Sequence, residues 1–198
     1  MTGVDRPRIE AAVTELLLAI GEDPSRPGLV RTPKRVADSY AEFFGGLEVD
    51  PVSHLLDAVP LGVSDDGLPQ TSDAVIVRGI DFRSICEHHL LPFVGIVHVA
   101  YLPGERVVGL GKLADVVETL STRPQLQERL TEEIAEALET GLGARGVLVV
   151  MDAVHRCVVA RGSRQAGSST VTVASRGELT DPVARAELMA LIGESPRS

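Results

Sequence analysis

The sequence predicts an α+β domain, in which helices cover one face of an antiparallel sheet, preceded by a helical extension. The order of the predicted elements carries this prediction, because two helices come first, and a strand and a hairpin then precede two more helices and further strands. Hydrophobic residues make up 44% of the 198 residues and aromatic residues only 3%, so the core must consist mainly of Val, Leu, Ile and Ala. We expect residues 1–72 to form the extension with a connection, and residues 73–198 to form the main domain.

Two helices are predicted in the extension. Apolar residues recur at intervals of three and four over residues 9–20, after which Gly21 can end the helix. The second helix is expected to begin at Thr32 as its N-cap, with Pro33 in its first turn. Residues 47–72 contain three prolines and indicate a connection that holds one short helix over residues 52–58.

The main domain is expected to contain strands, helices between them, and one hairpin. Strands are predicted over residues 74–80, which are rich in β-forming residues, over residues 95–102, where apolar residues alternate, and over the continuous apolar run 147–153. Two more strands are predicted over residues 157–160 and 169–174. The turn at residues 103–106 is expected to close the hairpin, with a partner strand at residues 107–110. Helices are predicted over residues 112–120, from Pro124 to Gly141 or Gly143, and after a cap at Asp181, with Leu188, Leu191 and Ile192 turned inward.

The acidic composition disfavours some classes of binding partner. The formal net charge is -9 and the sequence pI is near 5.0, so non-specific binding to nucleic acid or to an anionic membrane is disfavoured. An anionic small substrate is still compatible with a site that gathers Arg and Lys. The sequence begins without an apolar signal core and contains no apolar run of membrane-spanning length. These features predict a soluble cytoplasmic protein.

Two short segments hold both cysteines and three of the five histidines. The first is Cys86-Glu87-His88-His89, and the second runs from His155 to Cys157. A disulfide between the two cysteines is disfavoured, because each cysteine has a histidine beside it and no secretion signal precedes them. The pattern therefore predicts one metal site assembled from two distant segments of the chain.

Zinc is the metal that best suits these residue types, since it takes thiolate and imidazole ligands. Cys86 and His89 are three residues apart, so a tight turn can direct both at one ion. On a strand, residues two apart share a face, so Cys157 can complete a Cys-His-Cys set with His155 beside it. Three ligands leave a fourth position for an activated water, next to an imidazole that serves as general acid or base.

Two other interpretations of the segments stay open at this stage. A structural zinc site would take His88 or His155 as a fourth ligand, although such sites usually contain Cys-x-x-Cys, which is absent here. Alternatively, two buried cysteines lie beside unrelated histidines. His54 and His98 have no partner in the sequence and are expected at the surface or in strand packing.

Several ordered motifs resemble those of the GTP cyclohydrolase I family. They begin at about Glu10, continue through the last helix, and include Arg31–Val36, Cys86–Leu90 with Pro92–Gly95, Gly109–Ala114, Arg123–Thr131, Ala153–Cys157 and Arg161-Gly162. The resemblance implies the tunnelling fold, or T-fold, whose antiparallel sheet carries two helices on one face. It also implies a homo-oligomer, a decamer made of two pentamers, with active sites between subunits.

The resemblance implies a reaction and a role for each matching residue. The guanine imidazole ring of GTP is opened hydrolytically, C8 leaves as formate, and the product closes to 7,8-dihydroneopterin triphosphate. Zinc would be held by Cys86, His89 and Cys157, and its bound water would attack C8. The main proton donor would be His155, assisted by His88. The remaining residues would bind substrate, the guanine at Glu128 and Gln127 and the phosphates at Lys112, Arg161 and Arg35.

The sequence departs from the family pattern at the phosphate subsite. The serine common in the family before the lysine is Gly111 here, and Asp115 stands where the family usually has an arginine. The segment 176–179 also lacks a phenylalanine often found there. A carboxylate should repel phosphate, unless Arg83, Arg123 or Arg164 compensates.

These departures support two alternatives to the ordinary reaction. One is the same ring-opening chemistry on a less phosphorylated or altered guanine compound. The other is a T-fold protein that binds purine or pterin without catalysis, which the retained metal and histidine residues disfavour. A nitrile reductase would place its cysteine differently, and a zinc deaminase would need a Pro-Cys-x-x-Cys segment.

Overall fold

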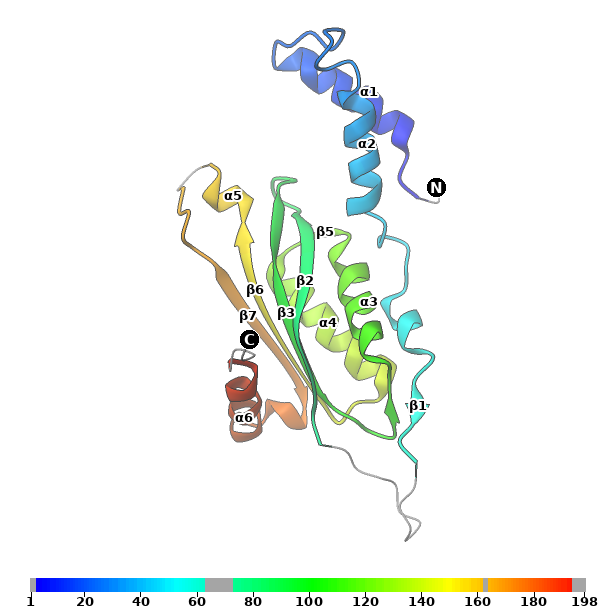
Figure 1. Ribbon diagram of the computed structural model, residues 1–198, viewed down its shortest axis with the longest axis vertical. Helices are drawn as coiled ribbons and strands as arrows, with labels where there is room; N and C mark the ends of the chain where they lie inside the picture. The colour runs from blue at the N-terminus through cyan, green and yellow to red at the C-terminus, as the bar shows by residue number, and fades with distance from the viewer. Residues whose placement is uncertain (1–2, 63–72, 162–163, 194–198) are drawn as a thin grey trace.

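The computed structural model describes residues 3–62, 73–161 and 164–193. Figure 1 shows a helical extension at one end of the molecule and a sheet backed by two helices. Within these described ranges, no helix combines the length and the apolar character that crossing a membrane requires.

The extension consists of α1 (Arg6–Ala19) and α2 (Thr32–Phe43), which pack against each other. The expected start of α2 is displaced by one residue. Thr32 is already helical, and the cap position belongs to Arg31, whose side chain makes no capping bond. The reason is local, because the Thr32 amide donates to the Leu29 carbonyl (2.8 Å) and so continues the preceding turn into the helix.

The connection contains the expected short helix and an additional strand. The helix is η1 (Pro51–Leu55), a 3-10 turn whose Leu55 is fully buried. After it, β1 (Val59–Pro60) pairs antiparallel with β4 (Arg106–Val107). The predicted hairpin at residues 103–106 is therefore wrong. Its expected partner, β3 (Pro92–Leu102), is already paired on one side with β2 (Val75–Cys86) and on the other with β6 (Gly146–His155).

The main sheet has five strands in the order β5-β2-β3-β6-β7. Its last strand is β7 (Thr170–Gly177), and every pairing is antiparallel except that of β5 (Pro124–Gln125) with the end of β2. The prediction that Pro124 opens a helix is thus wrong. Residues 124–125 add a short parallel strand beside Cys86, and the helix begins only at Gln127.

Two helices cover one face of the sheet, as predicted, and they are α3 (Leu110–Ser121) and α4 (Gln127–Leu142). Gly143 ends α4 in the left-handed conformation (φ 59°). Alternate residues of the central strands face these helices, so Val99 and Val149 join the main core while Ala100 and Leu148 point to the opposite face. In Figure 1, α4 lies behind the strands and α3 lies beside β2.

A last helix, α6 (Pro182–Gly193), packs on the opposite face. The Asp181 carboxylate caps it, as predicted, by accepting from the amides of Val183 and Ala184 (both 3.0 Å). Leu188 and Ile192 are buried against the sheet, but Leu191 is 48% exposed, so its predicted inward position is wrong.

The segment after β6 is helical rather than extended. The sequence predicts a strand over residues 157–160, but Arg156–Val159 form the short helix α5. The register explains the difference, because His155 pairs with Phe93 near the beginning of β3, and little of that neighbour is left to pair with. The chain instead bonds locally, from the Ala160 amide to the Arg156 carbonyl (3.0 Å).

Candidate metal and active site

The first part of the site is a tight turn between β2 and β3. The Leu90 amide donates to the Cys86 carbonyl (2.9 Å), and the Cys86 amide donates to the Leu91 carbonyl (2.9 Å). Leu90 lies in the left-handed region (φ 51°), which reverses the chain within a few residues. Cys86 is buried at the end of β2, and the turn brings the exposed His89 back beside it.

The second part of the site follows β6. The pairing of Phe93 with His155 places the end of β6 next to the β2–β3 turn. Cys157 then lies in the single turn of α5, so the helix rather than a strand directs its thiol toward Cys86. The metal-binding atoms of Cys86, His89 and Cys157 all lie within 4.8 Å of one another. The structure thus brings together the three predicted metal ligands from two distant segments.

The donor set and its dimensions fit zinc. Three atoms that are mutually within 4.8 Å lie within 4.8/√3, about 2.8 Å, of a common centre. Zinc binds thiolate sulfur at about 2.3 Å and imidazole nitrogen at about 2.0–2.1 Å. Inward shifts of at most about 0.5 Å for each sulfur and about 0.8 Å for the nitrogen would therefore give bonding distances. Cys86 and Cys157 are both free thiols, so both are available to an ion.

The electrostatics of the thiol pair favour a cation. Burial, and after it the neighbouring Cys86 thiol, raise the pKa of Cys157, while the guanidinium of Arg161 opposes the shift. A thiolate at this position is therefore costly unless a positive charge compensates it. Arg161 follows α5 and is exposed.

His155 is the most tightly held of the predicted catalytic residues. Its ring stacks on the buried Phe93, with centroids 4.7 Å apart and planes within 2°. Its Nε2 lies 2.7 Å from Oε1 of Gln127. Burial lowers the pKa of His155, and the carboxylate of Glu128 acts against that shift. The neutral imidazole is therefore favoured in the folded chain.

Gln127 fixes which nitrogen of His155 carries the proton. Its side chain is 1% exposed, and its amide nitrogen donates to the Thr170 carbonyl (2.8 Å) and the Thr172 hydroxyl (3.1 Å). Because the donors of the amide are engaged there, its oxygen faces His155 and accepts from Nε2–H. The neutral ring consequently presents Nδ1 as its free base. The family resemblance predicts Gln127 as a substrate-binding residue, whereas within this chain its side chain contacts His155.

The other predicted site residues are distributed over several elements. His88 is exposed in the turn, with its ring centroid 6.2 Å from that of His89. Glu128 is exposed in the first turn of α4, next to Gln127. His88 therefore lies on the turn that carries Cys86 and His89, and Glu128 directly follows the residue that contacts His155.

The predicted phosphate ligands are less closely gathered. Lys112 lies 3.7 Å from Asp57 in an exposed ion pair, at the start of α3. That end of α3 is next to the β1–β4 pair, opposite the turn between β2 and β3 (Figure 1). Arg35 is exposed on α2, within the extension. We call the turn between β2 and β3, which carries Cys86 and His89, the metal-binding turn. Within one chain, Lys112 and Arg35 do not lie beside it.

Two residues beside the site were given no role by the sequence. Phe93 supports His155 across the sheet, and Arg129 contacts the metal-binding turn through Glu87. The i,i+4 spacing of Arg129 from Gln125 and Glu133 signals a helix-surface cluster. Only the folded structure shows that Glu87, 42 residues before Arg129, also belongs to this cluster.

Comparisons with known proteins point to one family. The sequence model described as GTP cyclohydrolase I matches residues 9–193. GTP cyclohydrolase 1 of Leifsonia xyli subsp. xyli (strain CTCB07) is 63% identical over 193 residues, which cover 98% of this chain and 98% of that protein. GTP cyclohydrolase 1 of Geobacillus sp. (strain WCH70) is 50% identical over 97% of this chain and 99% of that protein. Among solved structures, an archaeosine synthase QueF-Like in the apo form matches 55% of this chain and 97% of that one, at 17% identity and a TM-score of 0.43.

Proposed function

Because the chain belongs to the GTP cyclohydrolase I family, we propose that it is a hydrolase that opens the guanine imidazole ring of GTP. The ring carbon C8 leaves as formate, the ribose rearranges, and its carbons close the new ring of 7,8-dihydroneopterin triphosphate. The convergence of Cys86, His89 and Cys157 within 4.8 Å, beside His155, is the observation that carries this proposal.

The proposed cofactor is zinc, held by Cys86, His89 and Cys157. When bound, zinc supplies Lewis acidity and a water whose pKa is lowered toward neutrality. His155 exchanges protons with the substrate through Nδ1, since Gln127 holds its Nε2 proton. A positioned acid–base group of this kind contributes about 10²–10⁴-fold to the rate. His88, on the turn that carries Cys86 and His89, assists His155 in proton transfer.

Glu128 is proposed to hold the guanine base. A carboxylate only accepts hydrogen bonds, and guanine presents two adjacent donors, N1–H and the 2-amino group. The side chain is exposed at the beginning of α4, where the helix dipole favours its negative charge.

The active enzyme is proposed to be a homo-oligomer, a decamer of two pentamers, with sites between subunits. In such sites, Lys112 and Arg35 of one copy would bind the substrate phosphates at the metal-binding turn of another copy. Arg161 would bind the phosphates with them. Unpaired apolar surface supports assembly, because Leu16, Leu18 and Ile20 of the extension are 53–66% exposed. The outer edge of β7 also lacks a strand partner among the described residues.

A second candidate substrate is a less phosphorylated guanine compound, and Asp115 is the observation that favours it. This carboxylate is exposed one turn after Lys112 on α3. Arg123 is already engaged, because it donates to the carbonyls of Gly46 (2.9 Å) and Val49 (2.6 Å). Arg83 lies 3.5 Å from Glu118. Both of these possible compensating cations therefore have anionic or carbonyl partners elsewhere.

The test is a product assay on zinc-loaded protein with GTP, GDP, GMP and guanosine offered separately. Formate release and pterin fluorescence would be followed for the wild type, for His155→Ala, and for His54→Gln as a control histidine outside the site. Formate and pterin from GTP, lost in His155→Ala alone, are the expected result. Preference for GMP would establish the second candidate, and formate without pterin would mean that the reaction ends at ring opening. Tight guanine binding with zinc but no turnover would refute the catalytic proposal in favour of a purine-binding protein.

A further inference from the structure

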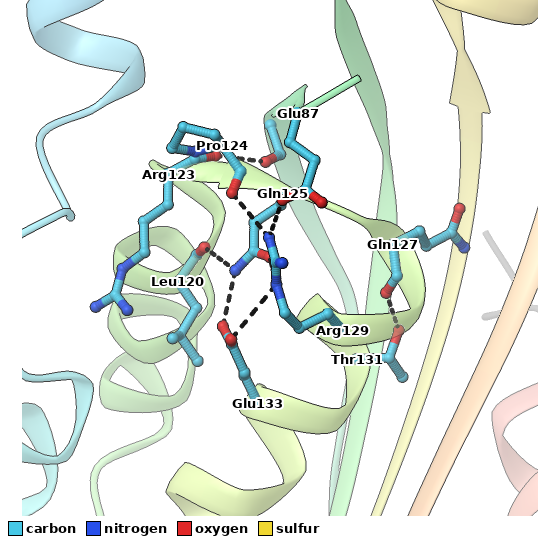
Figure 2. A network of polar contacts seen from close by, with 10 residues as sticks. Glu87, Leu120, Arg123, Pro124, Gln125, Gln127, Arg129, Thr131 and Glu133 are labelled. Carbon is cyan, nitrogen blue, oxygen red and sulfur yellow. Dashed lines mark hydrogen bonds and ion pairs between the residues drawn. The ribbon is translucent and has the colours of Figure 1, made fainter. Parts of the chain in front are cut away.

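A network of polar side chains joins Glu87, the residue between Cys86 and His88, to Gln125 and Arg129 (Figure 2). Its centre is Arg129, in the first turn of α4. The Arg129 guanidinium donates from Nη2 to the Glu87 carboxylate (2.5 Å) and the Pro124 carbonyl (3.1 Å), and from Nε to Oε1 of Gln125 (2.9 Å). One side chain thus joins α4, β5 and the turn that carries Cys86 and His89.

The position of Arg129 is fixed by a buried partner. Gln125 is 1% exposed, and its amide nitrogen donates to the Leu120 carbonyl at the end of α3 (3.2 Å) and to the Glu133 carboxylate (2.7 Å). Its oxygen therefore has a single orientation, toward Arg129. A guanidinium held in this way loses less side-chain freedom when it binds a carboxylate than a free surface arginine does.

Glu87 connects Arg129 and Gln125 to the metal-binding turn. It follows Cys86 directly and precedes His88 and His89. Its backbone amide also donates to the Gln125 carbonyl (3.0 Å), so the network holds both its main chain and its side chain. The rest of the turn has little core packing, because residues 88–90 are exposed. The tether therefore adds to the backbone hydrogen bonds of the turn in holding the segment that carries His89.

We propose that Arg129 is a positioning residue that locks the metal-binding turn to α4 through Glu87 and thereby slows the release of zinc. The inference rests on the proposed zinc site but not on the reaction. Neither residue is one of the metal ligands. Loss of partners that orient metal ligands typically weakens metal binding about 10–100-fold. Glu87 acts through the backbone, so we expect roughly tenfold faster zinc release when the pair is broken, the lower end of that range.

An ordinary surface ion pair elsewhere in the chain provides the matched control. Arg145 donates from Nη1 to the Glu178 carboxylate (2.9 Å) and from Nε to the Pro103 carbonyl (3.0 Å). Its side-chain exposure of 38% is close to the 43% of Arg129. This pair joins the ends of β3, β6 and β7 that lie away from the metal-binding turn. Arg145→Gln therefore removes similar chemistry without touching the tether.

The experiment measures zinc release from the full-length, zinc-loaded chain into a chromogenic chelator, after the initial zinc content has been determined. Arg129→Gln, Glu87→Gln and the double variant should each release zinc about tenfold faster than the wild type. The double variant should match the single ones, because the two residues act as a unit. Arg129→Lys should also be fast, since an ammonium lacks the planar fork that reaches all three partners. Arg145→Gln should release zinc at the wild-type rate.

Two results would overturn the proposal. One is a wild-type release rate in Arg129→Gln. The other is equal acceleration in Arg129→Gln and Arg145→Gln, which would attribute the effect to general destabilisation, and urea unfolding of the zinc-free proteins would measure that destabilisation directly. A wild-type chain that binds no zinc would instead refute the zinc site of the proposed function, so the two failures are distinguishable.

Discussion

Replacing Gln127 by leucine should impair catalysis while leaving zinc in place. The substitution removes the oxygen that accepts from His155 Nε2 at 2.7 Å, and it also removes the donors to Thr170 and Thr172. The imidazole itself remains, and so does its stacking on Phe93. What is lost is the fixed tautomer and orientation of the ring.

The size of the effect can be bounded from these contacts. His155→Ala should lose the whole contribution of a general acid–base group, about 10²–10⁴-fold in kcat. Gln127→Leu should lose only part of it, and we expect about a 10- to 100-fold decrease in kcat, which corresponds to about 1.4–2.8 kcal/mol. The free energy of unfolding should fall by about 1–3 kcal/mol, because buried polar groups lose a partner. The Thr172 hydroxyl keeps its hydrogen bond to Thr131 (2.6 Å), which limits that loss.

The assay is single-turnover formate release by the wild type, Gln127→Leu, His155→Ala and the double variant, at equal zinc content. If Gln127 acts through His155, the double variant should be no slower than His155→Ala alone. Gln127→Glu is a useful companion, because it keeps an acceptor for Nε2–H but cannot donate to Thr170. Losses that multiply in the double variant, or an unchanged kcat in Gln127→Leu, would refute the reasoning.

Two further predictions concern the phosphate subsite and a histidine outside the active site. Asp115→Arg should lower the KM for GTP but not for GMP, and an unchanged KM for GTP in steady-state kinetics would contradict repulsion by the carboxylate. Burial, and after it Arg78, lower the pKa of His98, so the folded chain favours the neutral ring. The free energy of unfolding should therefore decrease as the pH falls from the unfolded value of about 6.5 through the lower folded value. Urea titrations between about pH 5 and pH 8 should show this component in the wild type and not in His98→Gln; identical pH profiles would contradict it.

Much of the fold followed from local sequence signals. The helix α1, the apolar stripe of α4, the apolar run of β6 and the cap at Asp181 are all signalled by neighbouring residues, and the structure confirms them. The predicted stripe of α1 is not buried as a whole within this chain, because only Leu17 is buried while Leu16 and Ile20 are exposed. The sequence also singled out the candidate metal ligands, because Cys86 and His89 are close in the chain and Cys157 is the only other cysteine, and the structure brings these three side chains together. Family motifs then fixed the expected chemistry, since their order and spacing extend over most of the sequence.

The tertiary structure decided the features that depend on distant partners. Residues 157–160 had the composition of a strand, but the chain bonds locally there because β3 begins beside His155. Residues 106–107 pair with the connection because both edges of β3 are occupied. The orientation of Gln127 toward His155 and the tether from Arg129 to Glu87 join residues 28 and 42 positions apart. A hydrogen bond across such a separation exists only after the strands and helices have packed, so the sequence contained these residues but not their partnership.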